Sequence, residues 1–435
     1  MSANIYAERR KRFLERMGDH AVAVIAAAPV AIRNNDVEHE YRQNSDFFYL
    51  TGLDEPESVL ILGNVHESDE TVLFVRPRNP ERELWDGPRV GVDGAKETLG
   101  ADAAFEGKEL DRKLPGYLQN AESLFYRVGL DRPMDERVFA ALEATRRRHR
   151  FGQGFPTSIV DPGAHVHELR LAKDDTEVAT MRRAAAVTAE AHAAARRIAK
   201  PGAYEYEVEA EILRVFRRSG CERPAYGSIV GSGPNATILH HRRNDRLIED
   251  GDLLLIDAGC ELEYYASDVT RTFPVSGAFT EAQRTIYDLV LKAQLACIDA
   301  VRPGATLVEI HDIAVREITT GLIELGLVEG PLEEAIEEER FKPFYMHRTS
   351  HWLGMDVHDV GLYYDRGAPR ALAPGYVLTV EPGIYIGRDA EVDEKWRGIG
   401  VRIEDDVLVT DDGHLNLTEA IPKDPDELER ELQGR

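Results

Sequence analysis

The stretch Gly251-Asp-Leu-Leu-Leu-Ile-Asp257-Ala-Gly259 decides the fold, because it returns later in the chain as Gly375-Tyr-Val-Leu-Thr-Val-Glu381-Pro-Gly383. Each copy places five mostly apolar residues between a glycine and a carboxylate, which is typical of a short buried strand that ends at an acid. Two further echoes, Lys200-Pro-Gly-Ala-Tyr-Glu205 and Arg302-Pro-Gly-Ala-Thr-Leu307, each follow one helical stretch and open another. The repeat predicts two similar halves of helices followed by strands, related by a pseudo-twofold axis, with the two acids at corresponding positions.

The first third of the chain predicts a separate α/β domain. A helical pattern of charges over residues 7–17 precedes three apolar segments that we interpret as strands, at 21–25, 59–62 and 71–75. A Gly- and Pro-punctuated stretch then changes the composition near Pro162. We therefore expect an N-terminal α/β domain over residues 1–170 and a second domain over residues 171–435, whose first helix runs from about Lys173 to Ala199.

Composition narrows the classes of function. The 435 residues contain 53 Lys and Arg against 78 Asp and Glu, a formal net charge of −25, which repels a phosphate backbone and makes nucleic acid an unexpected partner. Three cysteines supply no disulfide framework and no thiolate metal site, which fits a reducing cytoplasm. The apolar run 21–30 is too short to span a bilayer, and no small-residue cleavage site follows it. We expect a cytoplasmic protein without a membrane partner.

Four carboxylates of the second domain lie at strand ends and are candidate metal ligands: Asp257, Asp268, Glu381 and Glu404. A hairpin over the eleven residues from Asp257 to Asp268 would bring these two acids together on adjacent strands. Residues 400–409 alternate as a half-buried strand that presents Arg402 and Glu404 on one face. Buried carboxylates are costly unless a cation compensates them, so we expect a divalent metal; the alternative is surface strand ends paired with arginine.

The segment Met346-His347-Arg348-Thr349-Ser350-His351-Trp352-Leu353-Gly354-Met355-Asp356-Val357-His358-Asp359 holds three of the 14 histidines. Histidine binds metals and moves protons near neutral pH. One imidazole added to the four acids gives five ligands, mostly oxygen, which suit Mn²⁺ better than a structural zinc. Four carboxylates balance two divalent ions, and a bridging hydroxide would then be the nucleophile that attacks a substrate carbonyl.

Five motifs together resemble the Xaa-Pro aminopeptidases (aminopeptidase P) of the pita-bread metallopeptidase family, in the family's order and spacing. They are Leu255-Ile-Asp257-Ala-Gly-Cys260, Ser267-Asp268-Val-Thr-Arg-Thr-Phe-Pro274, Ser350-His351-Trp-Leu-Gly-Met-Asp-Val-His358-Asp359, Leu378-Thr-Val-Glu381-Pro-Gly383 and Gly400-Val-Arg402-Ile-Glu404-Asp405. Tyr41–Gly52 and Glu83-Leu-Trp85 are similar to the family too, so the resemblance covers nearly the whole chain. It implies a pita-bread catalytic domain, release of the N-terminal residue from peptides with proline at the second position, and a homodimer or homotetramer.

The resemblance also implies roles for individual residues. Two metal ions, usually manganese, would be bound by Asp257, Asp268, His351, Glu381 and Glu404. Asp268 and Glu404 would bridge the two ions. Glu381 would also carry the proton from the nucleophile to the leaving amine. His240 and His358 would contact the substrate or stabilise the tetrahedral intermediate.

Four more residues would complete the site by the same resemblance. His347 would line the pocket for the proline ring, and Arg402 would orient a ligand carboxylate. Tyr226 would lie near the site. Trp85 would reach the active site of a neighbouring subunit, with packing in a core or an interface as the alternative.

Arg348 and Thr349 depart from the family pattern, which has smaller or apolar residues between His347 and Ser350. If Arg348 faced the proline pocket, it could recognise a peptide carboxylate, and selectivity would shift towards dipeptides. That is the activity of prolidase, which is the alternative function within the same class; the alternative for Arg348 is exposure to solvent. A metal-free binding protein with this fold is disfavoured, because all five ligand positions carry suitable donors.

Overall fold

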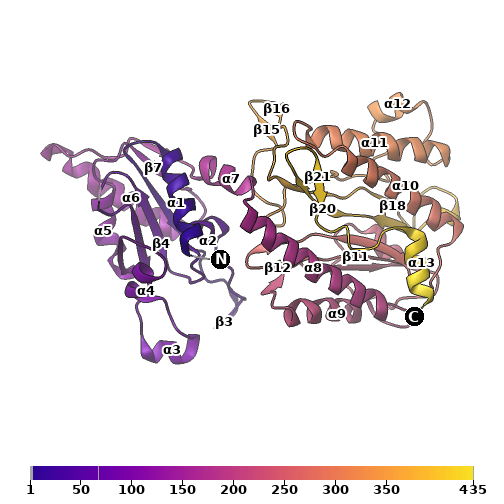
Figure 1. Cartoon of the computed structure of the whole chain (residues 1–435), viewed down its shortest axis with the longest axis horizontal. Coiled ribbons are helices and arrows are strands. Elements are labelled where there is room, and N and C mark those ends of the chain that lie inside the picture. The colour runs from indigo at the N-terminus through magenta and orange to yellow at the C-terminus, as the bar shows by residue number, and fades with distance from the viewer. Residues whose placement is uncertain (1–2, 67, 435) are drawn as a thin grey trace. The chain divides into compact units, whose positions relative to one another are not determined.

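The computed structural model describes residues 3–66 and 68–434. The chain divides into two compact units, Met1–Arg170 and Leu171–Arg435, each with a hydrophobic core of its own (Figure 1).

The N-terminal unit is an α/β domain around one six-stranded mixed sheet, in the order β6-β5-β4-β1-β7-β8. The strands are β1 (Ala21–Ala26), β4 (Val59–Gly63), β5 (Thr71–Val75), β6 (Ala103–Glu106), β7 (Ser123–Phe125) and β8 (Ser158–Val160). The helices are α1 (Ala3–Met17), α2 (Ser45–Thr51), α3 (Pro80–Asp86), α4 (Gly91–Glu97), α5 (Leu110–Tyr117), α6 (Arg132–Arg147) and α7 (Gly163–Leu171), and a short hairpin joins β2 (Ile32–Asn34) to β3 (Val37–Glu38). The central strands are buried on both faces, which explains their uninterrupted apolar sequences.

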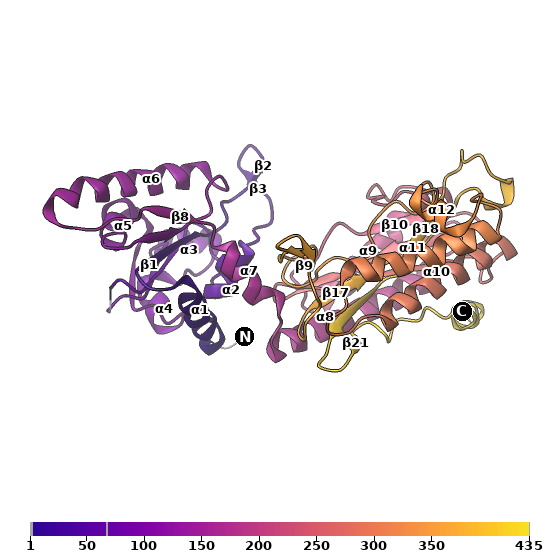
Figure 2. The ribbon, with the colours of Figure 1, turned by 90° about the horizontal axis from the view of Figure 1, so that it is seen from above.

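The second unit consists of two halves, each with a pair of helices followed by a three-stranded antiparallel sheet. The first half contains α8 (Asp175–Ile198), α9 (Glu205–Arg218), β10 (Ile229–Ser232), β11 (Leu253–Asp257) and β14 (Thr270–Pro274). The second contains α10 (Glu281–Asp299), α11 (Leu307–Glu324), β17 (Val377–Val380), β20 (Asp405–Val409) and β21 (His414–Asn416). In Figure 1 the two helix pairs lie on opposite sides of the strands, and Figure 2 shows α10 and α11 side by side.

Smaller elements connect these halves and line their junction. They are β9 (Arg223–Pro224), β12 (Cys260–Leu262), β13 (Tyr265–Ala266), α12 (Leu332–Glu337), β15 (Tyr364–Asp365), β16 (Ala368–Pro369), β18 (Gly383–Ile386), β19 (Ile399–Arg402) and α13 (Pro425–Gln433). Helix α8 begins with Asp174 as its N-cap, whose side chain accepts hydrogen bonds from the amides of Thr176 and Glu177. No helix of the described residues has the length and apolar content needed to cross a membrane.

The sequence repeats fall on matching structural positions. The two Pro-Gly-Ala segments directly precede α9 and α11, and Gly251 and Gly375 directly precede the turns into β11 and β17. Both glycines have a left-handed backbone, with φ of 84° and 87°. Residues with a Cβ are disfavoured in this conformation, so glycine allows the same sharp entry into both strands.

The expectation of one half-buried strand over residues 400–409 was wrong. The segment forms two strands, β19 and β20, and is buried throughout. Strand β19 pairs with β18, whereas β20 pairs with β17, so the chain changes sheet at Ile403 and Glu404. Polar residues tolerate this burial because they have partners; Asp405, for example, accepts a hydrogen bond from Arg271 at 2.6 Å.

The two equivalent glycines give a matched test of this backbone geometry. A Cβ at Gly251 would meet nothing within 4 Å, whereas a Cβ at Gly375 would lie 3.0 Å from the carbonyl oxygen of Lys173. We expect Gly251→Ala to lower the free energy of unfolding by about 1–2 kcal/mol, the cost of the left-handed backbone alone, and Gly375→Ala to lower it further. Urea unfolding followed by tryptophan fluorescence measures both variants, and equal losses would contradict the proposed difference.

Candidate metal centre and active site

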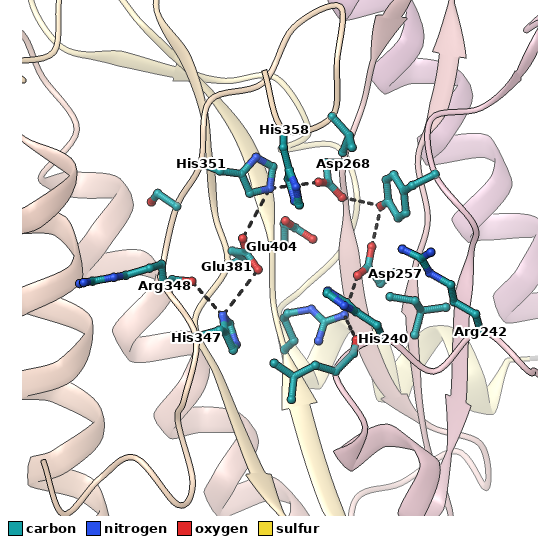
Figure 3. A pocket seen from close by; sticks show the side chains of 16 residues that line it. His240, Arg242, Asp257, Asp268, His347, Arg348, His351, His358, Glu381 and Glu404 are labelled. Atoms are coloured by element: carbon teal, nitrogen blue, oxygen red, sulfur yellow. Dashed lines mark hydrogen bonds and ion pairs between the residues drawn. The ribbon is translucent and has the colours of Figure 1, made fainter. Parts of the chain in front are cut away.

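The junction of the two halves encloses a polar cavity of about 310 Å³. It is lined by ten of the eleven residues that the sequence predicts for the site (Figure 3). They are Tyr226, His240, Asp257, Asp268, His347, His351, His358, Glu381, Arg402 and Glu404. Residues separated by almost 180 positions in the sequence therefore face one space.

Each acid is placed by the end of a strand. Asp257 is the last residue of β11 and pairs with Thr270 of β14, while Asp268 precedes β14. The chain between them returns through the β12–β13 hairpin, whose turn residues Glu263 and Tyr264 have φ of 50° and 70°. The predicted hairpin is therefore present, although its strands belong to a different sheet from β11 and β14.

The second half supplies the other two acids by a related arrangement. Glu381 follows β17 directly, and Glu404 lies at the break between β19 and β20. Thr270 donates a hydrogen bond to Glu404 at 2.6 Å, which links the acid of one half to a strand of the other. The pseudo-twofold arrangement thus brings carboxylates from both halves to one place (Figure 3).

Three residues have donor atoms that all lie within 4.8 Å of one another, namely Asp268, His351 and Glu404. His351 Nε2 is 3.4 Å from Asp268 Oδ2 and 3.5 Å from Glu381 Oε1. His351 Nδ1 lies 3.0 Å from the carbonyl oxygen of Trp352, which can only accept a hydrogen bond. The proton therefore belongs on Nδ1 and leaves Nε2 free as a ligand, as in metal-binding histidines generally.

Asp257 is held by two hydrogen-bond donors. Tyr226 donates from its hydroxyl to Asp257 at 2.6 Å and also contacts Asp268, and Arg402 Nη2 donates to Asp257 Oδ2 at 2.6 Å. Arg402 is almost fully buried and also donates to the hydroxyl of Tyr385 at 3.0 Å. These contacts fix the orientation of the carboxylate before any cation binds.

The electrostatics of the cluster fit a cation. Burial and the neighbouring acids raise the pKa of Glu404 well above its ordinary value, and burial raises the pKa of Glu381 to about 7. The pKa of Asp257 is raised too, because burial outweighs the charge of Arg402. For His351, burial is outweighed by Asp268 and Glu381, which raise its pKa to about 9. A group of buried acids that resists ionisation is the donor set that a divalent metal would stabilise.

Two buried ion pairs hold the segments that carry the site. Lys173 Nζ lies 3.0 Å from Asp359 Oδ2, with both side chains 1% exposed, directly after His358. Arg271 pairs with Asp405 at 2.6 Å, directly after Glu404, and neither side chain is exposed. A buried pair costs several kcal/mol when one partner is lost, so these contacts fix the backbone beside two functional residues.

The other three histidines lie around the acids, and of these His347 has its Nδ1 3.8 Å from Glu381 Oε2. His347 Nε2 is 2.8 Å from the hydroxyl of Tyr385, and burial and Arg402 lower its pKa to about 3, so the ring is neutral. The ring of His358 packs against that of His351 at 4.4 Å between centroids. His240 is exposed at the opposite wall (Figure 3).

Trp85 is the one predicted site residue outside this cluster. It lies on α3 in the N-terminal unit, where its side chain is 85% exposed. Packing in the core of its own unit is therefore excluded, and a role in a neighbouring subunit stays a prediction.

Several contacting residues were missed from the sequence. Thr270 hydrogen-bonds to Glu404, Thr379 to the amide of His351, and Tyr385 to His347. Arg242 also lines the cavity. Two signals pointed to them: Thr270 lies two residues after Asp268, and Tyr385 interrupts the apolar strand β18. A polar group in a buried strand needs a partner, but the sequence does not identify that partner.

Arg348 lies beside His347 but points away from the acids (Figure 3). It is exposed, and its backbone carbonyl accepts a hydrogen bond from His347 Nδ1 at 2.8 Å. Arg348 was expected to favour dipeptides only if its side chain faced the proline pocket beside His347. Since the side chain points away, this condition is not met.

Comparison with known proteins agrees with this geometry. Residues 179–411 match metallopeptidase family M24, and residues 6–126 match the aminopeptidase P N-terminal domain. The chain is 46% identical to a protein named Xaa-Pro aminopeptidase from Escherichia coli (strain K12) over 434 residues, which cover 99% of this chain and 97% of that protein. It is also similar to the structure of Pseudomonas aeruginosa aminopeptidase PepP, with a TM-score of 0.98, 49% identity and coverage of 100% and 98%. A third relative is zinc-substituted aminopeptidase P from E. coli in complex with product, with a TM-score of 0.96, 44% identity and coverage of 100% and 99%.

The fold and the acidic cluster thus define a two-domain metallopeptidase with a pita-bread catalytic domain. Within metallopeptidase family M24, the chain belongs to the Xaa-Pro aminopeptidases (aminopeptidase P). The resemblance inferred from the five motifs is confirmed, as are the α/β N-terminal domain and the pita-bread domain.

The raised pKa values predict how metal binding depends on pH. In the metal-free protein, Glu381 keeps a proton up to a pKa of about 7, whereas an unfolded Glu loses it near about 4.3. The contribution of Glu381 to the stability of the folded protein is therefore fully present below the unfolded pKa, and it is lost as the pH rises through 7. His351, whose pKa is raised to about 9, loses its contribution as the pH rises through 9.

Since cations bind the deprotonated ligands, the increase in Tm on adding Mn²⁺ to metal-stripped protein should be larger at pH 8 than at pH 5.5. Differential scanning fluorimetry measures this increase. Glu381→Gln, which cannot titrate, should show a smaller difference between the two pH values. An equal increase in the wild type at both would argue against binding to these acids.

Proposed function

We propose that this protein is a metal-dependent aminopeptidase that hydrolyses the bond between a free N-terminal residue and a following proline. The observation that carries the proposal is the convergence of four buried carboxylates and His351, from both halves of the catalytic unit, in one cavity. Full-length similarity to proteins named Xaa-Pro aminopeptidase supports the same activity.

The proposed cofactor is a pair of divalent cations, which Asp257, Asp268, His351, Glu381 and Glu404 would hold. The donor set of four carboxylates and one imidazole supports manganese as the metal, since hard oxygen ligands dominate. When bound, two such cations lower the pKa of water and polarise a carbonyl. The relative described as zinc-substituted supports a requirement for metal in the family.

The residues of the chain divide the remaining work. Glu381 follows β17 directly and lines the cavity, where it would take a proton from the attacking water and return it to the leaving nitrogen. A peptide nitrogen leaves as an amine only after it gains a proton, so the returned proton would complete cleavage of the bond to proline. His358, whose pKa is lowered by burial, and His240 lie at opposite walls of the cavity and are proposed as donors to the substrate and its tetrahedral intermediate.

The proposed proline pocket is the space beside His347. Its ring packs edge-on against Tyr345 at 5.1 Å and lies 5.5 Å from the ring of Tyr385. His347 lines the cavity, whereas Tyr345 and Tyr385 are buried and contact its ring. The Tyr385 hydroxyl donates a hydrogen bond to His347 Nε2, which holds the imidazole in place for contact with a pyrrolidine ring.

A peptide panel tests this function. With Mn²⁺ we expect cleavage of Ala-Pro-Ala, little cleavage of Ala-Ala-Ala, and loss of activity with EDTA. Glu381→Gln should lower kcat by at least about a hundredfold, the usual contribution of a general acid and base, while the circular dichroism spectrum stays unchanged. Equal rates on Ala-Pro-Ala and Ala-Ala-Ala would reject the proline specificity, and faster cleavage of Ala-Pro would favour prolidase.

We also propose a cytoplasmic homodimer or homotetramer in which Trp85 reaches the active site of a neighbouring subunit. Helix α3 has no buried residue, and the side chains of Leu84 and Trp85 are 86% and 85% exposed. Two adjacent exposed apolar side chains favour a contact with another chain. The three cysteines are free and buried, which supports a reducing compartment.

Subunit mixing tests the role of Trp85. Trp85→Ala should lower kcat/KM, whereas Phe139→Ala, which truncates an exposed aromatic residue on α6, should not. A mixture of Trp85→Ala and Glu381→Gln subunits, exchanged at low concentration, should regain activity above the sum of the two, because some sites then contain both native residues. Absence of any gain, with subunit exchange verified by mass spectrometry, would place Trp85 outside the neighbouring site.

A further inference from the structure

A second cavity of about 590 Å³ adjoins the metal cavity and is larger than it. The two share Arg348, Ser350, His351 and His358, so the second cavity meets the metal cavity at these residues. Its other walls are the start of α11, with Leu307, Val308 and His311, and the aromatic segment Tyr363 and Tyr364. The cavity therefore combines apolar and aromatic walls with several polar side chains, and polar groups set in an apolar wall can fix the orientation of a ligand.

Arg348 is the cationic group of this second cavity. Its guanidinium points away from the acids towards α11, and within residues 3–66 and 68–434 it has no ion pair and no hydrogen bond. The chain has 78 acidic residues against 53 Lys and Arg, and Arg402, which lines the metal cavity, has a carboxylate partner in Asp257. An unpaired guanidinium that lines a cavity is available for a carboxylate of the ligand.

The wall opposite Arg348 is held rigidly. His311 Nδ1 lies 2.8 Å from the hydroxyl of Thr349, and that hydroxyl is 2.6 Å from the hydroxyl of Tyr345. Thr349 and Tyr345 are buried, so this chain of hydrogen bonds ties α11 to the segment that carries Arg348. Arg348 and Thr349, which depart from the family pattern, therefore belong to one site. Arg348 supplies the cation, and Thr349 positions the segments around it.

The geometry of an aminopeptidase substrate indicates which part of the peptide enters this cavity. In the substrate, only one residue precedes the scissile bond. The proline that follows the bond is assigned to the pocket beside His347. Every further residue follows the proline and needs a path away from the acids. The second cavity opens beside His351 and His358 and offers such a path.

We propose that the second cavity binds the residues after the proline, and that Arg348 selects peptides with a carboxylate there. This inference rests on the proposed function. The carboxylate has two possible sources, the side chain of an acidic third residue or the C-terminus of a tripeptide. Both present the same planar group to the guanidinium, and both lie one residue beyond the carboxylate of an Xaa-Pro dipeptide.

Two pairs of substrates separate the sources. Ala-Pro-Glu-amide against Ala-Pro-Gln-amide isolates the side chain, and Ala-Pro-Ala against Ala-Pro-Ala-amide isolates the C-terminus. We expect the wild type to prefer the carboxylate member of at least one pair by about tenfold in kcat/KM, as for one charge-assisted hydrogen bond near a surface. Arg348→Gln should abolish the preference, and Arg348→Lys should retain part of it.

Charge reversal makes the test independent of a loss of folding. Arg348→Glu should prefer Ala-Pro-Lys-amide over Ala-Pro-Glu-amide, which is a gained activity. Arg316→Ala, which removes a positive charge from the exposed face of α11, should keep the wild-type preference. Metal content is measured for each variant.

Two results would overturn the inference: no carboxylate preference in the wild type, or a preference that persists unchanged in Arg348→Gln. Failure of the proposed function is a separate outcome, because the wild type would then not cleave Ala-Pro-Ala-amide at all.

Discussion

The burial of four carboxylates at the junction of two sheets is the constraint on which the rest of the catalytic unit depends. Asp257, Asp268, Glu381 and Glu404 come from both halves and face one cavity. Like charges at this separation raise each other's pKa, and burial adds to the effect. Such a cluster is tolerated in a folded protein when a cation compensates it, which is why the metal and the fold are two parts of one arrangement.

The surroundings of the cluster show how the chain maintains it. Glu404 and Asp405 are adjacent, yet they have opposite environments. Burial and other acids raise the pKa of Glu404, whereas for Asp405 the charges of Arg271 and Lys423 outweigh burial and lower its pKa to about 2. One acid is thus available for a metal while its neighbour is a permanently ionised anchor of the strand.

The duplicated architecture gives the site both its symmetry and its specificity. The matching strands β11 and β17 supply acids from the two halves, but the halves differ in what surrounds these acids. The first half offers Tyr226, His240 and Arg242, and the second offers His347, His358 and Tyr385. An acidic cluster drawn from both halves therefore has asymmetric walls, as a substrate with a distinct N-terminal residue and proline requires.

The sequence by itself determined the two domains' classes, the duplication and the identity of the family, because apolar segments that end at acids recur with a fixed order and spacing. It could not determine which sheet each segment joins. Residues 400–409 alternate like one strand, and only pairing with two different neighbours breaks them at Glu404. The direction of Arg348 was equally open, since a side chain's direction depends on packing against distant elements such as α11. Local pattern fixes which residues can form a strand or a ligand, whereas long-range packing decides where each side chain points.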